Sequence, residues 1–140
     1  MTTTYDMFTP TIQKTHDWMR DLMAELHWDD PSHAYVAMRA TLHALRDRLT
    51  VAEVAQLAAQ FPMLIRGFYY EGWKPSEKPR RMRHADEFFA QVESNLRTDL
   101  PADTPSIVRA VFTVLEQRVS EGEISDVIQL LPKELRELWP

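Results

Sequence analysis

The sequence has no cysteine and only three glycines, and these absences exclude several kinds of functional site. Without cysteine the chain cannot form disulfides, thiolate metal sites or cysteine nucleophiles. Three scattered glycines cannot build a glycine-rich phosphate loop, and the G-x-S-x-G nucleophile motif is missing. We therefore expect a protein with no catalytic centre and no bound cofactor.

Long apolar runs are missing as well. No stretch approaches the roughly 20 apolar residues that cross a bilayer. The segment MTTTYDMFTP also lacks the basic-then-apolar pattern of an export signal. The net charge of −5 opposes binding of the surface as a whole to nucleic acid or anionic lipid. The lack of cysteine fits a reducing compartment. We expect a cytoplasmic protein that forms a single domain over residues 1–140 and makes no membrane contact.

The chain matches itself, without a gap, when it is shifted by 70 residues. The identical pairs are Leu26/Leu96, Asp29/Asp99, Pro31/Pro101, Arg39/Arg109, Ala40/Ala110, Leu45/Leu115, Arg48/Arg118, Glu53/Glu123, Pro62/Pro132 and Arg66/Arg136. Apolar positions such as Leu42/Phe112 and Tyr69/Trp139 agree too. Two copies are too few for a solenoid. We predict two helical repeats, over residues 10–70 and 86–140, that pack face to face about an approximate twofold axis.

Capping signals divide each repeat into four helices. Thr9-Pro10 predicts the start of the first helix, and the motifs DDPS (29–32) and DTPS (103–106) predict the start of the two second helices. TVAE (50–53) and SEGE (120–123) are capping boxes, in which the hydroxyl accepts a backbone N–H and the glutamate reaches back. Pro62 and Pro132 end the third helices. No segment alternates like a strand, so the fold class is all-α, an internally duplicated helical bundle.

Both repeats carry a capped helix, a Phe-Pro or Leu-Pro break and a closing aromatic. In the sequence these read LRDRLTVAEVAQLAAQFPMLIRGFYYEGWKP (45–75) and VSEGEISDVIQLLPKELRELW (119–139). With these motifs the chain resembles the bacterial family catalogued as domain of unknown function 2267, over residues 11–139. The resemblance implies an all-helical, internally duplicated domain. It implies no activity and no catalytic or metal residue, and only a loose context in stress-response gene neighbourhoods.

The histidines and the repeated charges favour structural roles. The histidines are His16, His27, His33, His43 and His84, and no pair has the spacing that places two metal ligands on one helix face. We therefore predict no metal site. The pairs Arg48/Arg118, Glu53/Glu123, Arg39/Arg109 and Arg66/Arg136 are interpreted as ties at helix corners or between helices. The alternative is a ligand site on the pseudo-twofold axis, lined by both members of a pair.

The segment between the repeats, residues 71–85, is called the linker below and has no counterpart in the repeat. Its five lysines and arginines against two glutamates give a net charge of +3, which leaves −8 on the rest of the chain. Tyr70 and Trp73 lie at its start. Three interpretations remain open. The aromatic rings could pack the linker against the interface between the two repeats, or the linker could be a docking surface for an acidic protein or a second copy. It could also bind nucleic acid, with arginines on phosphates and aromatic rings stacked on bases.

We predict a helical binding or adaptor protein without a catalytic centre. Loops carry function more often than cores do, so the linker is the expected partner-binding surface. Its residues would be Tyr70, Trp73, Lys74, Arg80, Arg81 and Arg83. The expected partner is an acidic protein or a second copy. The alternative function is nucleic-acid binding through the basic linker.

Overall fold

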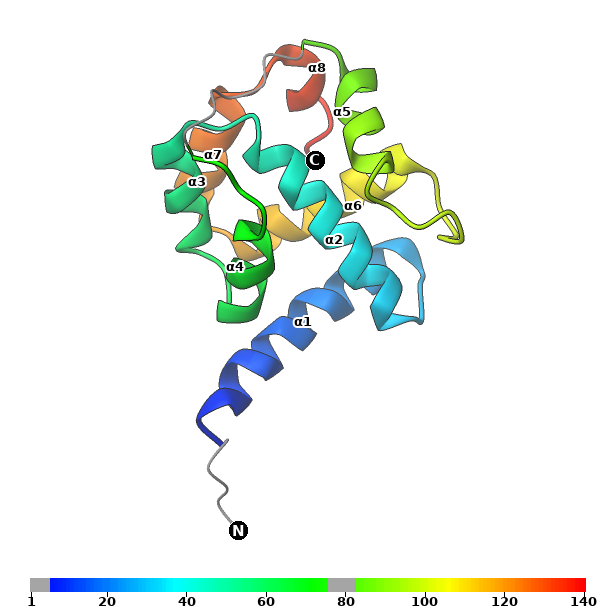
Figure 1. Cartoon of the computed structure of the whole chain (residues 1–140), viewed down its shortest axis with the longest axis vertical. Coiled ribbons are helices and arrows are strands. Elements are labelled where there is room, and N and C mark those ends of the chain that lie inside the picture. The colour runs from blue at the N-terminus through cyan, green and yellow to red at the C-terminus, as the bar shows by residue number, and fades with distance from the viewer. Residues whose placement is uncertain (1–5, 76–82) are drawn as a thin grey trace.

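The computed structural model describes residues 6–75 and 83–140, and this part of the chain is all-helical. The elements in order are a 3₁₀ turn, η1 (Asp6–Phe8), and the α-helices α1 (Thr9–Leu26), α2 (Pro31–Arg46), α3 (Val51–Ala58), α4 (Met63–Tyr70), α5 (Ala85–Glu93), α6 (Thr104–Arg118), α7 (Glu121–Gln129) and α8 (Lys133–Arg136). The described residues contain no strand (Figure 1). The predicted all-α class is confirmed.

Short polar side chains begin four of these helices as predicted. Asp30 Oδ1 accepts the backbone N–H of Ser32 at 2.9 Å, and Asp103 Oδ1 accepts that of Ser106 at 2.8 Å. Thr50 Oγ1 caps α3 at 3.2 Å and Ser120 Oγ caps α7 at 3.3 Å. Each bond satisfies a backbone donor that would otherwise lack a partner at a helix start.

One predicted helix start needs correction, and the 70-residue register fails at one pair of prolines. Thr9 is not a cap: the N-cap of α1 is Phe8, which makes no side-chain capping bond, and Thr9 is already helical. Pro31 opens α2, whereas Pro101 lies in the loop before α6, which begins at Thr104. The shift of 70 residues therefore does not hold at the start of these two helices. Pro62 and Pro132 both lie beyond the ends of α3 and α7, as expected, and they are the N-caps of α4 and α8.

The helices before the linker pack against the helices after it, so the two sets form one body. Helix α1 packs against α6, and α5 packs against α2. Helices α2 and α6 also contact each other, as do α3 and α7. Two short hydrogen bonds also join the helices before the linker to those after it. Arg48 Nη1 donates to Gln91 Oε1 and Arg118 Nε donates to Asp21 Oδ2, each at 2.6 Å.

Aromatic and aliphatic side chains from every helix form one hydrophobic core. Phe112 and Trp139 stack with their ring centroids 4.1 Å apart, and Phe61 meets Tyr69 edge-on at 5.0 Å. The Tyr69 hydroxyl donates to Val54 O at 3.1 Å, which satisfies its polar end inside the core. Because this core draws on helices from both sides of the linker, neither set of helices encloses it alone.

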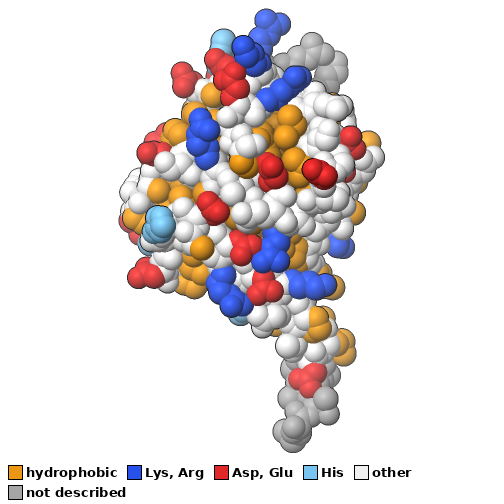
Figure 2. Space-filling model, turned by 180° about the vertical axis from the view of Figure 1, so that it is seen from behind, with side chains coloured by type: hydrophobic (Ala, Val, Ile, Leu, Met, Phe, Trp, Pro, Cys, Tyr) orange, Lys and Arg blue, Asp and Glu red, His pale blue; other side chains and the backbone are white. Residues whose placement is uncertain are grey.

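The surface outside this core mixes charges and isolated apolar groups. Figure 2 shows acidic and basic side chains interspersed on one face, with apolar atoms exposed along the projecting N-terminal part. That part includes η1 and the start of α1, where Phe8 and Ile12 are more than two fifths exposed. No described helix is both long and apolar enough to cross a membrane.

The helix caps give a first prediction. Thr50→Ala and Ser120→Ala should each lower the free energy of unfolding by about 1 kcal/mol, because each removes the acceptor of one helix-start N–H. Urea unfolding followed by circular dichroism measures the change. Ser125→Ala, at an exposed position inside α7, serves as the control and should change stability little. Equal stabilities of the cap variants and the control would contradict the prediction.

Candidate functional site

The predicted partner-binding surface is only partly exposed. Tyr70 and Trp73 are half-buried, and their rings contact each other with centroids 5.5 Å apart. Tyr70 also meets the buried Tyr69 at 5.3 Å. Lys74 and Arg83 are exposed. Arg80 and Arg81 lie outside the described residues. The two rings therefore help to hold the start of the linker against the core, and the described cations face solvent.

A buried arginine fixes the point at which the linker leaves the body. Arg46 Nη1 donates to Tyr69 O and to Glu71 O, both at 2.6 Å, and Arg46 Nε donates to Asp47 Oδ1 at 3.3 Å. A cation at this position also complements the negative C-terminal end of α4. Gly72 then turns the chain with a φ of 72°, a conformation that favours glycine. The basic linker thus starts from a defined position on α2 and α4.

The repeated arginines bind backbone or partner helices. Arg66 donates to Ala58 O and Phe61 O, each at 3.1 Å, at the corner between α3 and α4. Arg136 donates to Leu131 O at 2.6 Å and to Gln129 O at 3.4 Å, at the corner between α7 and α8. Arg39 pairs with Glu71 at 3.6 Å, and Arg109 donates to Glu137 O at 3.4 Å. The predicted corner and interhelix ties are confirmed for these residues.

Three of the five histidines contact a backbone carbonyl or a carboxylate. His43 is buried, and its Nε2 lies 2.6 Å from Phe68 O, so this nitrogen carries the proton. Burial lowers the pKa of His43 below its ordinary value of 6.5. His33 lies beside Asp30 and His84 beside Glu134. No group of three metal-capable side chains in the described ranges includes a histidine.

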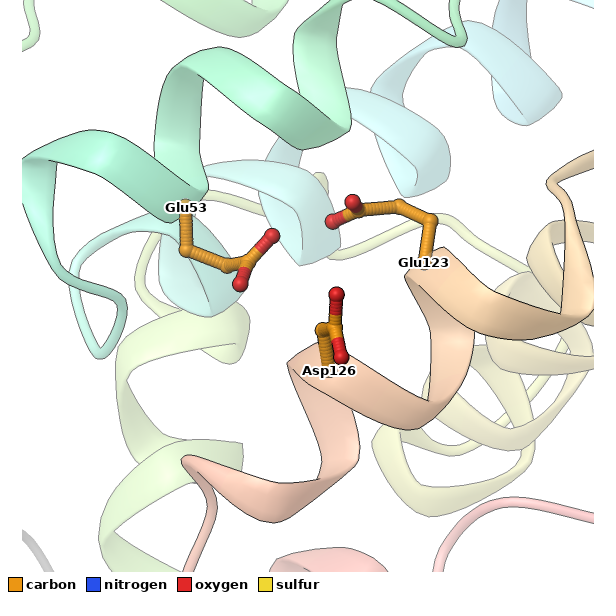
Figure 3. A group of neighbouring side chains, drawn as sticks. All are labelled: Glu53, Glu123 and Asp126. Carbon is orange, nitrogen blue, oxygen red and sulfur yellow. The ribbon is translucent and has the colours of Figure 1, made fainter.

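Three carboxylates meet where α3 packs against α7, and we call them the carboxylate cluster. Glu53 comes from α3, and Glu123 and Asp126 come from α7 (Figure 3). One oxygen of each lies within 4.8 Å of the others. Glu53 is 8% exposed and Glu123 is 9% exposed, whereas Asp126 is exposed to solvent. The cluster is therefore a pair of buried acids with a third acid at its opening.

The two buried carboxylates lack ordinary partners. Neither Glu53 Oε2 nor Glu123 Oε2 accepts a hydrogen bond from a described donor. Figure 3 shows both side chains pointing toward each other across the gap between their helices. Two carboxylates bond to each other only when one of them holds a proton. A charged pair buried at this distance would be strongly destabilising.

The electrostatics of the cluster favour retention of that proton. The pKa of Glu123 is raised to about 8, mainly by burial, then by the hydrogen bond and negative charge of Glu53, and last by the charge of Asp126. The nearby phenol of Tyr69 also has a raised pKa, mainly because it is buried. At neutral pH Glu123 is thus mostly protonated and can donate to Glu53. The carboxylate oxygens of the cluster can bind a proton or a cation, and they replace the water that a cation would lose on entering this buried site.

The sequence motif assigned a different contact to these glutamates. In a capping box the glutamate bonds back to the cap N–H, but the Ser120 N–H donates instead to Gln60 Oε1 at 3.2 Å. The hydroxyl half of each box was right, and the carboxylates turn toward each other. Only the alternative of a ligand site lined by both members of a pair pointed here, and Asp126 gave no signal because it has no acidic counterpart at position 56.

Another pocket on the described surface is a weaker candidate for a ligand site. Its volume is about 430 Å³, and its lining residues include Lys14, Trp18, Arg66 and Arg118. Its two arginines already bind backbone carbonyls and Asp21. The pocket therefore holds no cluster of uncommitted arginines for an anion.

The fold and these contacts define a class of protein: an all-helical domain with a buried acid pair between two capped helices. The chain belongs to the family of uncharacterized conserved proteins denoted DUF2267, which matches residues 15–138. No curated protein matches the chain. The resemblance noted from the motifs is confirmed.

The buried acid pair predicts that stability falls as pH rises. The pKa of Glu123 is raised from its ordinary 4.5 to about 8, so the folded state binds more protons than the unfolded state between these values. This contribution is complete below about pH 4.5 and is lost as the pH passes 8. Glu123→Gln keeps the shape without the charge. The variant should therefore gain stability relative to wild type as the pH rises, as measured by urea unfolding across this range.

A matched control removes the same charge elsewhere on α7. Glu121→Gln, at an exposed position, should keep the pH slope of wild type. The lowered pKa of His43 gives the opposite slope below about pH 6.5, but it is common to all variants and cancels in the differences. A difference between wild type and Glu123→Gln that does not change with pH would show that the acids do not share a proton.

Proposed function

We propose that the chain is a non-catalytic binding or adaptor protein of the cytoplasm, and that its linker binds an acidic protein partner. The observation that carries this proposal is the anchoring of the linker by Arg46. A basic segment that starts from a fixed position needs less ordering on binding than a free tail does. The stress setting implied by the family resemblance remains part of the proposal.

The charge distribution supports an acidic protein as the partner. The linker carries a net charge of +3 and the rest of the chain carries −8. A long polyanion such as nucleic acid would meet this acidic remainder, whereas a protein with a local acidic patch need not. The half-buried Trp73 and Tyr70 lie beside the exposed Lys74 and add the aromatic residue types that are common in interface cores.

The hydrogen bonds of the polar side chains to backbone carbonyls support a binding role over catalysis. His43 donates to a backbone carbonyl, and Arg46 and Arg66 bind carbonyls at helix ends. A catalytic base or an anion-binding arginine would instead direct these groups toward a substrate.

We further propose that the scaffold is an internal duplication, two four-helix repeats about a pseudo-twofold axis. Reciprocal contacts support it: Arg48 bonds Gln91 and Arg118 bonds Asp21, and each residue lies 70 positions from its counterpart. The corner bonds of Arg66 and Arg136 agree in the same register. A duplicated scaffold leaves the linker as the segment without a copy, free to carry an individual function.

Neutralising the linker should remove the partner. Immobilised wild-type chain should capture acidic proteins from nuclease-treated cell extract, and Lys74→Ala/Arg80→Ala/Arg81→Ala should lose them because the attraction is electrostatic. Trp73→Ala should weaken the same capture. Quantitative mass spectrometry of the captured proteins, with their isoelectric points, measures the effect.

A control with equal charge separates position from net charge. Lys14→Ala/Arg20→Ala/Lys133→Ala removes three exposed cations from α1 and α8 and should capture the same proteins as wild type. Equal capture by all variants would overturn the linker as the binding surface. Capture that occurs from untreated extract but not from nuclease-treated extract would favour nucleic acid. Recovery of the chain itself would favour a second copy, whose acidic body offers the same chemistry.

A further inference from the structure

We propose that the carboxylate cluster of Glu53, Glu123 and Asp126 binds a hard divalent cation such as Ca²⁺. This inference goes beyond the binding role proposed for the linker and rests on different residues. It begins with the side chains that α3 and α7 bring together (Figure 3).

The spacing of the oxygens fits a cation of this size. One oxygen from each acid lies within 4.8 Å of the others. Oxygens bind Ca²⁺ at about 2.3–2.6 Å, so two ligands on opposite sides of the ion lie about 4.6–5.2 Å apart. The cluster is therefore compact enough for one Ca²⁺ to contact an oxygen of each acid.

A second observation points to a ligand at this place. Glu53 Oε2 and Glu123 Oε2 are each inaccessible to solvent and accept no hydrogen bond from a described donor. Both side chains are more than nine-tenths buried, and both point into the space between the helices. A proton on Glu123 satisfies only one contact of this pair. A cation would contact both buried carboxylates together with Asp126.

The third acid supplies an entry route. Asp126 is exposed and follows Glu123 by three residues, so it lies on the same face of α7. An ion can meet Asp126 from solvent before it reaches the buried pair. Only three carboxylates converge on the site, so water must complete the coordination, and we expect a dissociation constant of about 10⁻⁴–10⁻³ M.

Calorimetric titration of the full chain with CaCl₂ tests the proposal. At pH 8 wild type should bind one Ca²⁺ per chain. Glu53→Gln and Glu123→Gln should each weaken Ca²⁺ binding by tenfold or more. Glu121→Gln, which removes an exposed charge from the same helix, should bind as wild type does.

A second readout places the ion without relying on the buried variants. Asp126→Asn changes an exposed residue that the core does not need, and it should weaken Ca²⁺ binding even if a buried variant fails to fold. Mn²⁺ should broaden the NMR signals of Glu53, Glu123 and Asp126 before those of Glu121. No Ca²⁺ binding by wild type up to several millimolar at pH 8 would overturn the proposal. Equal binding by Glu121→Gln and Asp126→Asn would overturn it as well.

Discussion

The structure depends on an exchange of helices across the linker: α1 packs on α6, and α5 packs on α2. Each contact buries apolar side chains that the helices on one side of the linker cannot cover by themselves. In this packing α3 and α7 also contact each other. Each of these two helices carries a glutamate in its first turn, and their contact produces the buried pair Glu53 and Glu123.

Several polar side chains elsewhere in the structure bond to backbone carbonyls. Arg46, Arg66 and Arg136 close helix ends, and the Tyr69 hydroxyl bonds Val54 O. In the core, by contrast, Thr41 Oγ1 and the Nε1 atoms of Trp28 and Trp139 have no described hydrogen-bond partner. The acid pair differs from these neutral groups because it could carry charge, and a buried charge is far more costly than a buried neutral group. Its cost is reduced by a proton on Glu123, and a cation would reduce it further. The same arrangement links the stability of the fold to pH.

Much of the fold could be predicted from local signals, whereas the candidate site could not. Asp30, Thr50, Ser120 and the two prolines of the Phe-Pro and Leu-Pro breaks act within one helix turn, so the sequence alone predicts them. The prediction that Thr9 caps α1 was wrong, because the helix starts one residue earlier than the Thr9-Pro10 motif suggests. The contact of Glu53 with Glu123 joins residues 70 positions apart, and it depends on how whole helices pack. The capping motif explained both residues locally, and this hid their contact.

The central claim is that packing of α3 on α7 brings these two carboxyl groups into one buried, proton-sharing pair. Titration of the side-chain carboxyl carbon of Glu123 by ¹³C NMR, in metal-free buffer, reports its protonation directly. The structure predicts a midpoint of about 8 for wild type, and a lower midpoint in Glu53→Gln, where the neighbouring negative charge is gone. A wild-type midpoint near the ordinary 4.5, unchanged by Glu53→Gln, would contradict the account.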